Sequence, residues 1–428
     1  MSVIFPNQDN KVLIIVATNF PYQNGEPYLE DELKIISPNV SKIIIALPEG
    51  ERNRKLNQVN TIPKNVEIVL FSSELKSSEK FTAIFSLLSV SVLKEFFNLK
   101  FFTKAKYSVL TLKTMADSFL RAKKFEKELE KYLLQNNLLK NNLSLVSYWC
   151  TEYSLSLVNI SKKHKSVSVF SRLHAWDIYL ERNYGNYLPF RKEIFEGLKK
   201  GLVISKNGLE YIFSNFNGID KKKFIVSALG VLPGKFWSSN KQNHKLRILT
   251  LAFISKVKRM ERIIEAFENI DPQIEIDWIH IGDGNFDYSK FENLAKDKLS
   301  KKKNIQFSLL GKMSKQEVYN FLDSTYFDLL LNSSDTEGLP VSMMECMARG
   351  IPVVAPNLGG IPEIVEHKKN GYLLSKDTNS EEIKKTIEFF INLENSEYEK
   401  YRKNAFETWE KKYDAQKNYS YSLDEFFN

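Results

Sequence analysis

The feature that most constrains the fold is the alternation of short apolar runs with helical patterns. One series of runs lies at residues 11–18, 41–48, 66–73, 143–149, 166–172 and 202–205, and a second lies at residues 247–254, 276–282, 305–311, 327–334, 352–356 and 371–375. The runs are rich in β-branched residues and continuously apolar, which is typical of parallel strands buried on both faces. Helical patterns such as ERIIEAFENI separate them. The sequence therefore predicts an α/β protein with two doubly wound, Rossmann-like domains.

A segment without periodicity separates the two series. It reads VLPGKFWSSNKQNHK, residues 231–245, and its Pro, Gly and polar residues are typical of a linker. We therefore expect one domain at residues 1–238, a second at residues 239–405, and a helical segment at residues 406–428. Because ligands of open parallel sheets bind beyond the carboxyl ends of the strands, functional residues should follow strands and face a cleft between the domains.

The composition is that of a folded protein, with 43% hydrophobic and 26% charged residues among 428. Its two cysteines, Cys150 and Cys346, are far apart and have no neighbouring metal ligands, and no secretory signal opens the chain. These features predict a protein of the reducing cytoplasm. The longest apolar run, residues 81–93, is shorter than the roughly 20 residues that cross a bilayer, so we expect no membrane span.

The net charge is +9, and part of the excess lies between Lys94 and Lys124, where Glu95 and Asp117 oppose a run of lysines and arginines. Large apolar residues, FFNLKFF, interleave with these cations. The pattern fits a solvated helix pair with one buried face, and it fits peripheral contact with an anionic membrane. Nucleic acid is a third alternative, but no nucleic-acid-binding motif accompanies the charge, so we expect no such partner.

Two glutamates frame a predicted helix in the second half. Glu337 lies in the loop SDTEG, and Glu345 lies inside the helix that we expect to begin near Pro340 and to end at Gly350. The free N–H groups and dipole of a helix N-terminus suit a diphosphate, and the carboxylates could accept from sugar and ribose hydroxyls. Such a pair is common on surface helices. It becomes informative because loop, helix, buried strand and Gly-Gly turn follow without interruption.

This phrase, residues 337–374, resembles the retaining glycosyltransferases of family 4, which have the two-domain GT-B fold and an E-x7-E motif. The resemblance implies that Glu337 contacts the donor sugar and that Glu345 binds the ribose. The backbone amides that would meet the sugar or diphosphate are those around Gly338, Leu339 and Val341. The aromatic-glycine pair that usually follows the first glutamate is shortened here.

Lys258 lies between a predicted strand and a predicted helix in LAFISKVKRMERIIEAF, where the family has its phosphate-binding lysine. Such a lysine would stabilise the charge of the leaving diphosphate. Many members also carry an arginine five residues earlier, where this chain has Phe253. Arg259 could substitute for it. Gly282, at the end of the next strand, is likewise assigned to the donor side.

In the first half the resemblance is patchier. His174 follows a predicted strand in SRLHAWDIYL, and the resemblance places it in the cleft near the reacting sugar. Arg172 and Asp177 are assigned to the cleft or the acceptor side, although an acid at a helix start can also serve as a cap. Gly25 and Glu26 lie in the loop after the first strand, which resembles that of members that build bacterial surface polysaccharides.

The resemblance implies transfer of a sugar, with retention, from a UDP- or GDP-linked donor to a hydroxyl of a glycan or lipid-linked acceptor in bacterial cell-surface polysaccharide synthesis. His174, Lys258 and Glu337 would be catalytic. Neither a metal nor another cofactor is expected, and the C-terminal helix would cross back to the first domain. A GT-B sugar-nucleotide epimerase or phosphorylase is one alternative. A non-catalytic nucleotide-sugar-binding subunit is another, and Phe253 favours it.

Overall fold

The structure is a computed structural model that describes residues 10–22, 26–49, 62–72, 89–101, 108–239, 241, 244–284 and 286–428. Contacts within the chain divide it into two compact units. The first comprises residues 1–228 and 418–428, and the second comprises residues 229–417. The expected boundaries lay after residues 238 and 405. The second unit thus begins earlier in the sequence than expected, at residue 229, and ends later, at residue 417.

The first unit contains a parallel sheet of seven strands in the order β3-β2-β1-β4-β5-β6-β7. The strands are β1 (Lys11–Val16), β2 (Lys42–Glu49), β3 (Val66–Ser72), β4 (Asn142–Ser147), β5 (Ser168–Leu173), β6 (Lys200–Val203) and β7 (Phe224–Val226). In the centre, Ile14 of β1 lies opposite Ile44 of β2 and Leu145 of β4. The first six strands confirm the predicted runs. The seventh was missed because three residues after a run of lysines carry little pattern.

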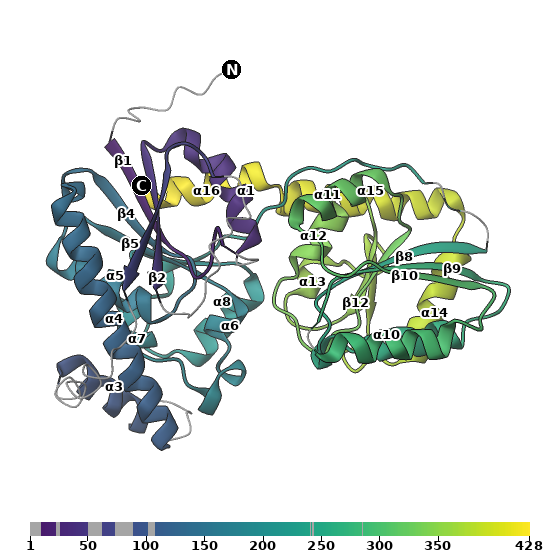
Figure 1. The fold of residues 1–428 in the computed structure, drawn as a ribbon, viewed down its shortest axis with the longest axis horizontal. Coiled ribbons are helices and arrows are strands. Elements are labelled where there is room, and N and C mark those ends of the chain that lie inside the picture. The colour runs from purple at the N-terminus through teal and green to yellow at the C-terminus, as the bar shows by residue number, and fades with distance from the viewer. Residues whose placement is uncertain are drawn as a thin grey trace. The chain divides into compact units, whose positions relative to one another are not determined.

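Helices cover both faces of this sheet (Figure 1). They are α1 (Pro27–Ile36), α3 (Val90–Phe101), α4 (Val109–Gln135), α5 (Glu152–Lys163), α6 (Ala175–Ile178), α7 (Arg191–Gly197) and α8 (Lys206–Asn215). Buried side chains of α4, α5 and α7 share one hydrophobic core with alternate residues of the central strands. The remaining alternate residues, such as Ser144 and Arg172, face α1 and the C-terminal helix.

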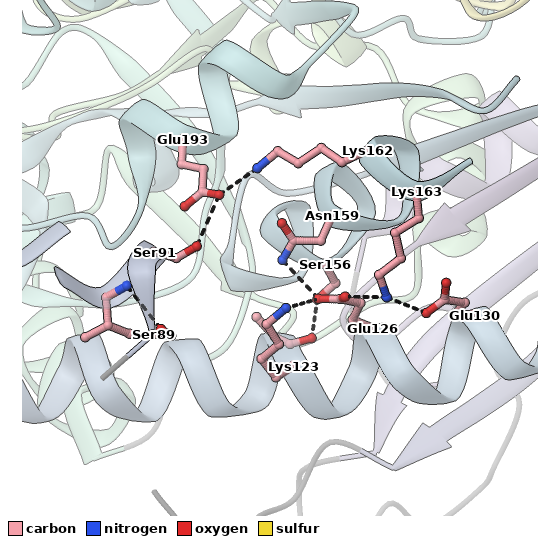
Figure 2. Close-up of polar contacts among 12 residues, drawn as sticks. Ser89, Ser91, Lys123, Glu126, Glu130, Ser156, Asn159, Lys162, Lys163 and Glu193 are labelled. Carbon is pink, nitrogen blue, oxygen red and sulfur yellow. Dashed lines mark hydrogen bonds and ion pairs between the residues drawn. The ribbon is translucent and has the colours of Figure 1, made fainter. Parts of the chain in front are cut away.

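Polar side chains connect helices α3, α4, α5 and α7 to one another (Figure 2). The buried Glu126 carboxylate of α4 accepts from Lys123 Nζ at 2.9 Å, from Asn159 Nδ2 of α5 at 2.9 Å and from Lys163 Nζ of α5 at 3.0 Å. A second carboxylate, Glu193 of α7, accepts from Lys162 of α5 at 2.6 Å. It also accepts from Ser91 Oγ of α3 at 3.4 Å, which adds a polar contact to the apolar contacts that Val92 and Leu99 of α3 make with the core.

The second unit contains a parallel sheet of six strands in the order β10-β9-β8-β11-β12-β13. They are β8 (Lys245–Leu251), β9 (Glu275–Ile281), β10 (Ile305–Leu309), β11 (Leu329–Leu331), β12 (Val353–Pro356) and β13 (Gly371–Leu374). All six confirm predicted runs. The helices are α9 (Met260–Glu268), α10 (Phe286–Leu299), α11 (Lys315–Ser324), α12 (Val341–Met347), α13 (Ile361–Ile364), α14 (Ser380–Ile391) and α15 (Asn395–Lys412). The core around Trp278 joins α9, α10 and α14 to the sheet.

The last helix, α16 (Ala415–Phe427), belongs to the first unit from Asn418 onward. Ser144 Oγ of β4 donates to the carbonyl of Phe426, and Ser422 Oγ lies 2.9 Å from Ser227 Oγ. Tyr419 and Phe426 are buried. The end of the chain therefore completes the core of the unit that its beginning starts. Within the described ranges, none of the helices is both long enough and apolar enough to cross a membrane.

Candidate functional site

Lys258 lies in the second unit, at the end of a 3-10 turn (Lys256–Lys258) that connects β8 to α9. Its backbone is fixed at both ends, because its N–H donates to the carbonyl of Ser255 at 2.9 Å and its carbonyl accepts from Ser333 Oγ at 2.9 Å. The side chain extends to Glu337, and Lys258 Nζ lies 2.6 Å from Glu337 Oε1. The structure therefore brings together two of the residues that the sequence assigned to the donor side.

Three donors converge on one oxygen of the Glu337 carboxylate. Besides Lys258 Nζ, Oε1 accepts from Ser334 Oγ at 2.7 Å and from Asn332 Nδ2 at 3.1 Å. Asn332 Oδ1 in turn accepts the backbone N–H of Ser334 at 3.0 Å. Sequence reasoning missed Asn332 and Ser334. Their position at the carboxyl end of a predicted strand, just before the loop of Glu337, was the signal that could have identified them.

A pocket opens at the carboxyl ends of β8 and β11, the edge at which open parallel sheets bind ligands. Its lining consists of Thr250, Leu251, Ala252, Lys258, Met260, Leu330, Leu331, Asn332, Ser333, Ser334 and Ser342. Gly282 lies behind this wall with φ +139°, and a Cβ there would come within 1.9 Å of the Ala252 carbonyl oxygen. A glycine at 282 therefore allows the β9 and β8 loops to approach each other closely.

The Gly-Gly turn after β12 packs directly against the loop of Glu337. A Cβ on Gly359 (φ +55°) would lie 2.2 Å from the Glu337 carbonyl oxygen, and one on Gly360 would lie 2.5 Å from that of Gly338. The Gly360 N–H donates to the Gly338 carbonyl at 2.8 Å. The turn thus requires glycine because it supports the carboxylate-bearing loop at close range.

Helix α12 is shorter than predicted. It begins at Val341, with Pro340 as the residue before it, and ends at Met347 instead of reaching Gly350. Gly350 has φ +69°, and its N–H donates to the carbonyl of Met347 at 2.9 Å. The helix closes early because this left-handed glycine turns the chain towards β12.

Glu345 lies in α12 and is half-buried, and Gly338, Leu339 and Val341 adjoin the pocket in sequence without lining it. The position of Glu345 in α12 is the one that the E-x7-E motif predicts. In the structure its carbonyl accepts from Nη1 of Arg349, at 2.9 Å.

Arg259 has a left-handed backbone (φ +49°) and forms ion pairs with Glu261 and with Asp335, the latter at 3.0 Å. Asp335 also pairs with Arg262 at 2.7 Å. Arg259 thus joins the loops after β8 and β11 beside the pocket. Phe253, at the position where the resemblance led us to expect arginine, is half exposed. Among the described residues, no three His, Cys, Asp or Glu side chains form a metal-binding group.

In the first unit, Glu26 is buried and holds its own loop. Its carboxylate accepts from the backbone N–H groups of Thr18, Asn19 and Phe20 at 2.6, 3.0 and 2.8 Å. The indole N–H of Trp149 is a fourth donor, at 3.0 Å. Since both oxygens are used internally, Glu26 fixes the shape of the loop after β1. Gly25 lies outside the described residues.

His174 and Asp177 are both buried at the carboxyl end of β5. Burial lowers the pKa of the His174 imidazole to about 3, so the ring is neutral, and its Nε2–H donates to the Tyr148 carbonyl at 3.1 Å. The ring stacks on Trp149 with centroids 4.1 Å apart. Burial raises the pKa of the Asp177 carboxyl to about 7, while the N–H groups of Cys150 and His174 donate to it at 2.7 and 2.6 Å. Asp177 therefore organises the turn at the start of α6.

Arg172 is completely buried on the face of the sheet towards α1 and α16. Its Nη2 pairs with Glu32 Oε1 at 2.6 Å and lies 3.3 Å from Ser422 Oγ. The guanidinium carbon lies 5.4 Å from the ring of Tyr148 and 5.8 Å from that of Tyr419. These contacts make Arg172 a link between β5, α1 and the C-terminal helix.

Solved glycosyltransferase structures share the fold of this chain. HepE of Anabaena, crystallised with UDP and glucose, aligns over 97% of this chain and 99% of its own with a TM-score of 0.62 and 15% identity. The chain has the GT-B fold.

Residues 234–408 match the family model described as Glycosyl transferases group 1. This group 1 domain contains the pocket, Lys258 and Glu337. Among curated relatives, the amylovoran biosynthesis glycosyltransferase AmsK of Erwinia amylovora is 31% identical over 163 residues, covering 36% of this chain and 39% of AmsK. The O-antigen biosynthesis glycosyltransferase WbnH of Escherichia coli is 30% identical over 202 residues, covering 47% and 52%. The alignments thus span about half or less of each relative's length.

Proposed function

We propose that this protein is a retaining glycosyltransferase of family 4 that moves a sugar from a UDP- or GDP-linked donor to a glycan or lipid-linked acceptor in bacterial surface polysaccharide synthesis. The observation that carries the proposal is the contact of Lys258 with Glu337 beside a pocket at the carboxyl edge of a group 1 domain. The relatives named for amylovoran and O-antigen synthesis support the biosynthetic setting. HepE, with UDP and glucose, supports a UDP-linked donor.

In this proposal the bond between the anomeric carbon and the diphosphate oxygen breaks while an acceptor oxygen attacks from the same face. The acceptor's proton passes to the departing phosphate, so charge and atoms balance. Lys258 neutralises the negative charge that grows on the diphosphate, which is the largest electrostatic demand of the transition state. Glu337 accepts a hydrogen bond from the donor sugar, and Glu345 accepts from the ribose. We also propose a catalytic role for the neutral imidazole of His174 in the first unit.

The donor can be identified by thermal shift of the full chain with a panel of UDP- and GDP-sugars, because a ligand that binds the folded state raises Tm. The stabilising donor is then incubated, radiolabelled in its sugar, with a bacterial lipid extract. Labelled glycolipid and free nucleotide support the proposal. An isomerised donor without product indicates an epimerase, and donor binding without turnover indicates a binding subunit; either result contradicts transfer.

We further propose that the protein is cytoplasmic and contacts an anionic membrane peripherally through α3 and the start of α4. Val90, Leu93 and Phe97 follow a helical spacing on α3, and Val90 and Phe97 are 67% and 56% exposed. At the start of α4, Val109 is 85% exposed. The exposed Lys94 lies within the same stripe. Apolar side chains flanked by cations favour insertion between anionic headgroups.

Flotation with vesicles containing phosphatidylglycerol, compared with pure phosphatidylcholine vesicles, tests this surface. The protein should float with the anionic vesicles, and Phe97→Glu should reduce the floated fraction. Leu134→Glu is the matched control, since Leu134 is also 56% exposed but lies at the opposite end of α4. Equal flotation of the Phe97 variant and the control would remove the proposed surface.

A further inference from the structure

The ion pair between Lys258 and Glu337 poses a problem for any diphosphate donor, because the lysine is already bound to a carboxylate and must leave it to bind a phosphate. Lys258 Nζ lies 2.6 Å from Glu337 Oε1, and both side chains are largely buried. A lysine that turns to a phosphate would leave the carboxylate behind, next to an anionic ligand. An unpaired buried charge costs several kcal/mol, so this exchange would oppose donor binding unless Glu337 keeps other partners.

Asn332 and Ser334 are such partners. A carboxylate oxygen has two lone pairs, and Glu337 Oε1 already accepts from Ser334 Oγ at 2.7 Å and from Asn332 Nδ2 at 3.1 Å. The lysine is therefore a third donor on an oxygen that two neutral donors can satisfy. When Lys258 leaves, Oε1 keeps its hydrogen bonds, and the carboxylate keeps its place.

The two donors are themselves rigidly held. The Asn332 N–H donates to the Val354 carbonyl of β12 at 2.9 Å, so its backbone is anchored to the sheet, and its Oδ1 accepts the Ser334 N–H at 3.0 Å. The neighbouring Ser333 Oγ donates to the carbonyls of Lys258 and Arg259, both at 2.9 Å. The backbones of both loops are thus tied together, while the Lys258 side chain can change partner by rotation alone.

We propose that Asn332 and Ser334 are positioning residues that hold Glu337 in its reactive orientation while Lys258 transfers its charge from Glu337 to the donor's diphosphate. The inference rests on the proposed function. It assigns different roles to the three donors on Glu337: Asn332 and Ser334 keep the carboxylate aligned, and the ammonium group of Lys258 is free to move. Such support from a second layer of residues preserves geometry in the transition state.

The first test compares nucleotide affinity with turnover in the full chain. Ser334→Ala and Asn332→Ala should lower kcat for the selected UDP-sugar by about tenfold each, the size expected for the loss of one positioning hydrogen bond. In each single variant the remaining neutral donor still satisfies Glu337 Oε1 when Lys258 turns to the phosphate, so the Kd of UDP by calorimetry should change less than about threefold, within roughly 0.7 kcal/mol. Ser334→Thr, which keeps the hydroxyl, should recover most of the lost turnover.

Ser324→Ala and Asn320→Ala are matched controls, because both residues lie on α11 with local, exposed hydrogen bonds. A folded Asn332→Ala/Ser334→Ala double variant with wild-type kcat would overturn the inference. In either single variant, a loss of UDP affinity as large as the loss of kcat, together with a lower Tm, would also overturn it, since it indicates a purely structural role. If the wild-type chain binds no nucleotide and transfers no sugar, the proposed function fails first.

A crystal structure of the wild-type chain with UDP gives an independent readout. Lys258 Nζ should then contact a phosphate oxygen, while Asn332 and Ser334 remain within hydrogen-bond distance of Glu337. A complex in which Lys258 stays on Glu337, or in which Glu337 leaves Ser334, would refute the proposed exchange even if every variant lost activity.

Discussion

The two units use charged groups at the carboxyl ends of their strands in opposite ways. In the second unit, Lys258 and Glu337 pair beside an open pocket. In the first unit, the buried Glu26 carboxylate accepts from backbone N–H groups of its own loop, and the buried Arg172 pairs with Glu32. The carboxyl ends of the strands thus carry an ion pair beside a pocket in one unit and side chains held in the interior in the other. Substitutions should accordingly damage ligand binding in the second unit and folding in the first.

The largest effect is expected at Arg172. Arg172→Met keeps the volume but leaves Glu32 buried without its cation, which typically costs about 3–5 kcal/mol. Chemical denaturation should show this loss in the transition of the first unit. Arg172→Met/Glu32→Gln should recover part of it, because the unpaired charge is gone. If the folded variant binds UDP with an affinity comparable to wild type, the result supports the contrast between the two units. A loss of UDP binding as large as the loss of stability would contradict it.

Lys258→Ala should show the opposite pattern. Removing a cation that stabilises a leaving diphosphate should lower kcat by about 10²–10³-fold, similar to the loss of one oxyanion donor. Tm should change little, since Asn332 and Ser334 still satisfy Glu337. Lys256→Ala, an exposed lysine in the same turn, is the matched control. Activity of Lys258→Ala equal to that of the control would count against the site.

Gly359→Ala tests whether the Gly-Gly turn supports the reactive loop. The added Cβ would meet the Glu337 carbonyl oxygen at 2.2 Å with φ at +55°, a combination expected to cost about 1–3 kcal/mol. Both Tm and kcat should fall. Gly218→Ala has a similar positive φ (+75°) but nothing within 4 Å of the new Cβ, so it should lower Tm slightly and leave kcat unchanged. Equal effects of the two substitutions would show that close packing at Gly359 is unimportant.

The smallest effect concerns pH. The pKa of His174 is about 3 in the folded state, below its ordinary value near 6.5. The unfolded chain therefore binds more protons than the folded one between these values, and this group's contribution to stability is lost as pH falls. At pH 5.5, one unit below the ordinary pKa of histidine, this group should lower the free energy of unfolding by about 1.4 kcal/mol. His174→Phe, measured against wild type by thermal denaturation, should gain relative stability between pH 7 and pH 5.5. Parallel pH curves would contradict a buried neutral imidazole.

Local patterns predicted the architecture well, and distant pairings limited the prediction of the sites. Continuous apolar runs sufficed for the strands because a parallel strand buried on both faces needs no partner to be recognised. The phrase around Glu337 predicted a loop, a helix and a glycine turn that the structure contains, because these elements are adjacent in sequence. The pairing of Arg172 with Glu32 spans 140 positions, and no spacing rule connects them. Asn332 and Ser334 were overlooked because their proposed role depends on the convergence of both side chains on one oxygen of Glu337, which only the folded loop creates.

The C-terminal helix has a consequence for how the protein is made. Residues 229–417 are contiguous and contain a whole sheet, so this unit has every strand it needs as soon as it leaves the ribosome. The first unit begins earlier but lacks the part of its core that includes Tyr419 and Phe426 until the final residues are synthesised. The unit that is translated first therefore finishes folding last, and a truncation of α16 should leave the second unit folded while it destabilises the first.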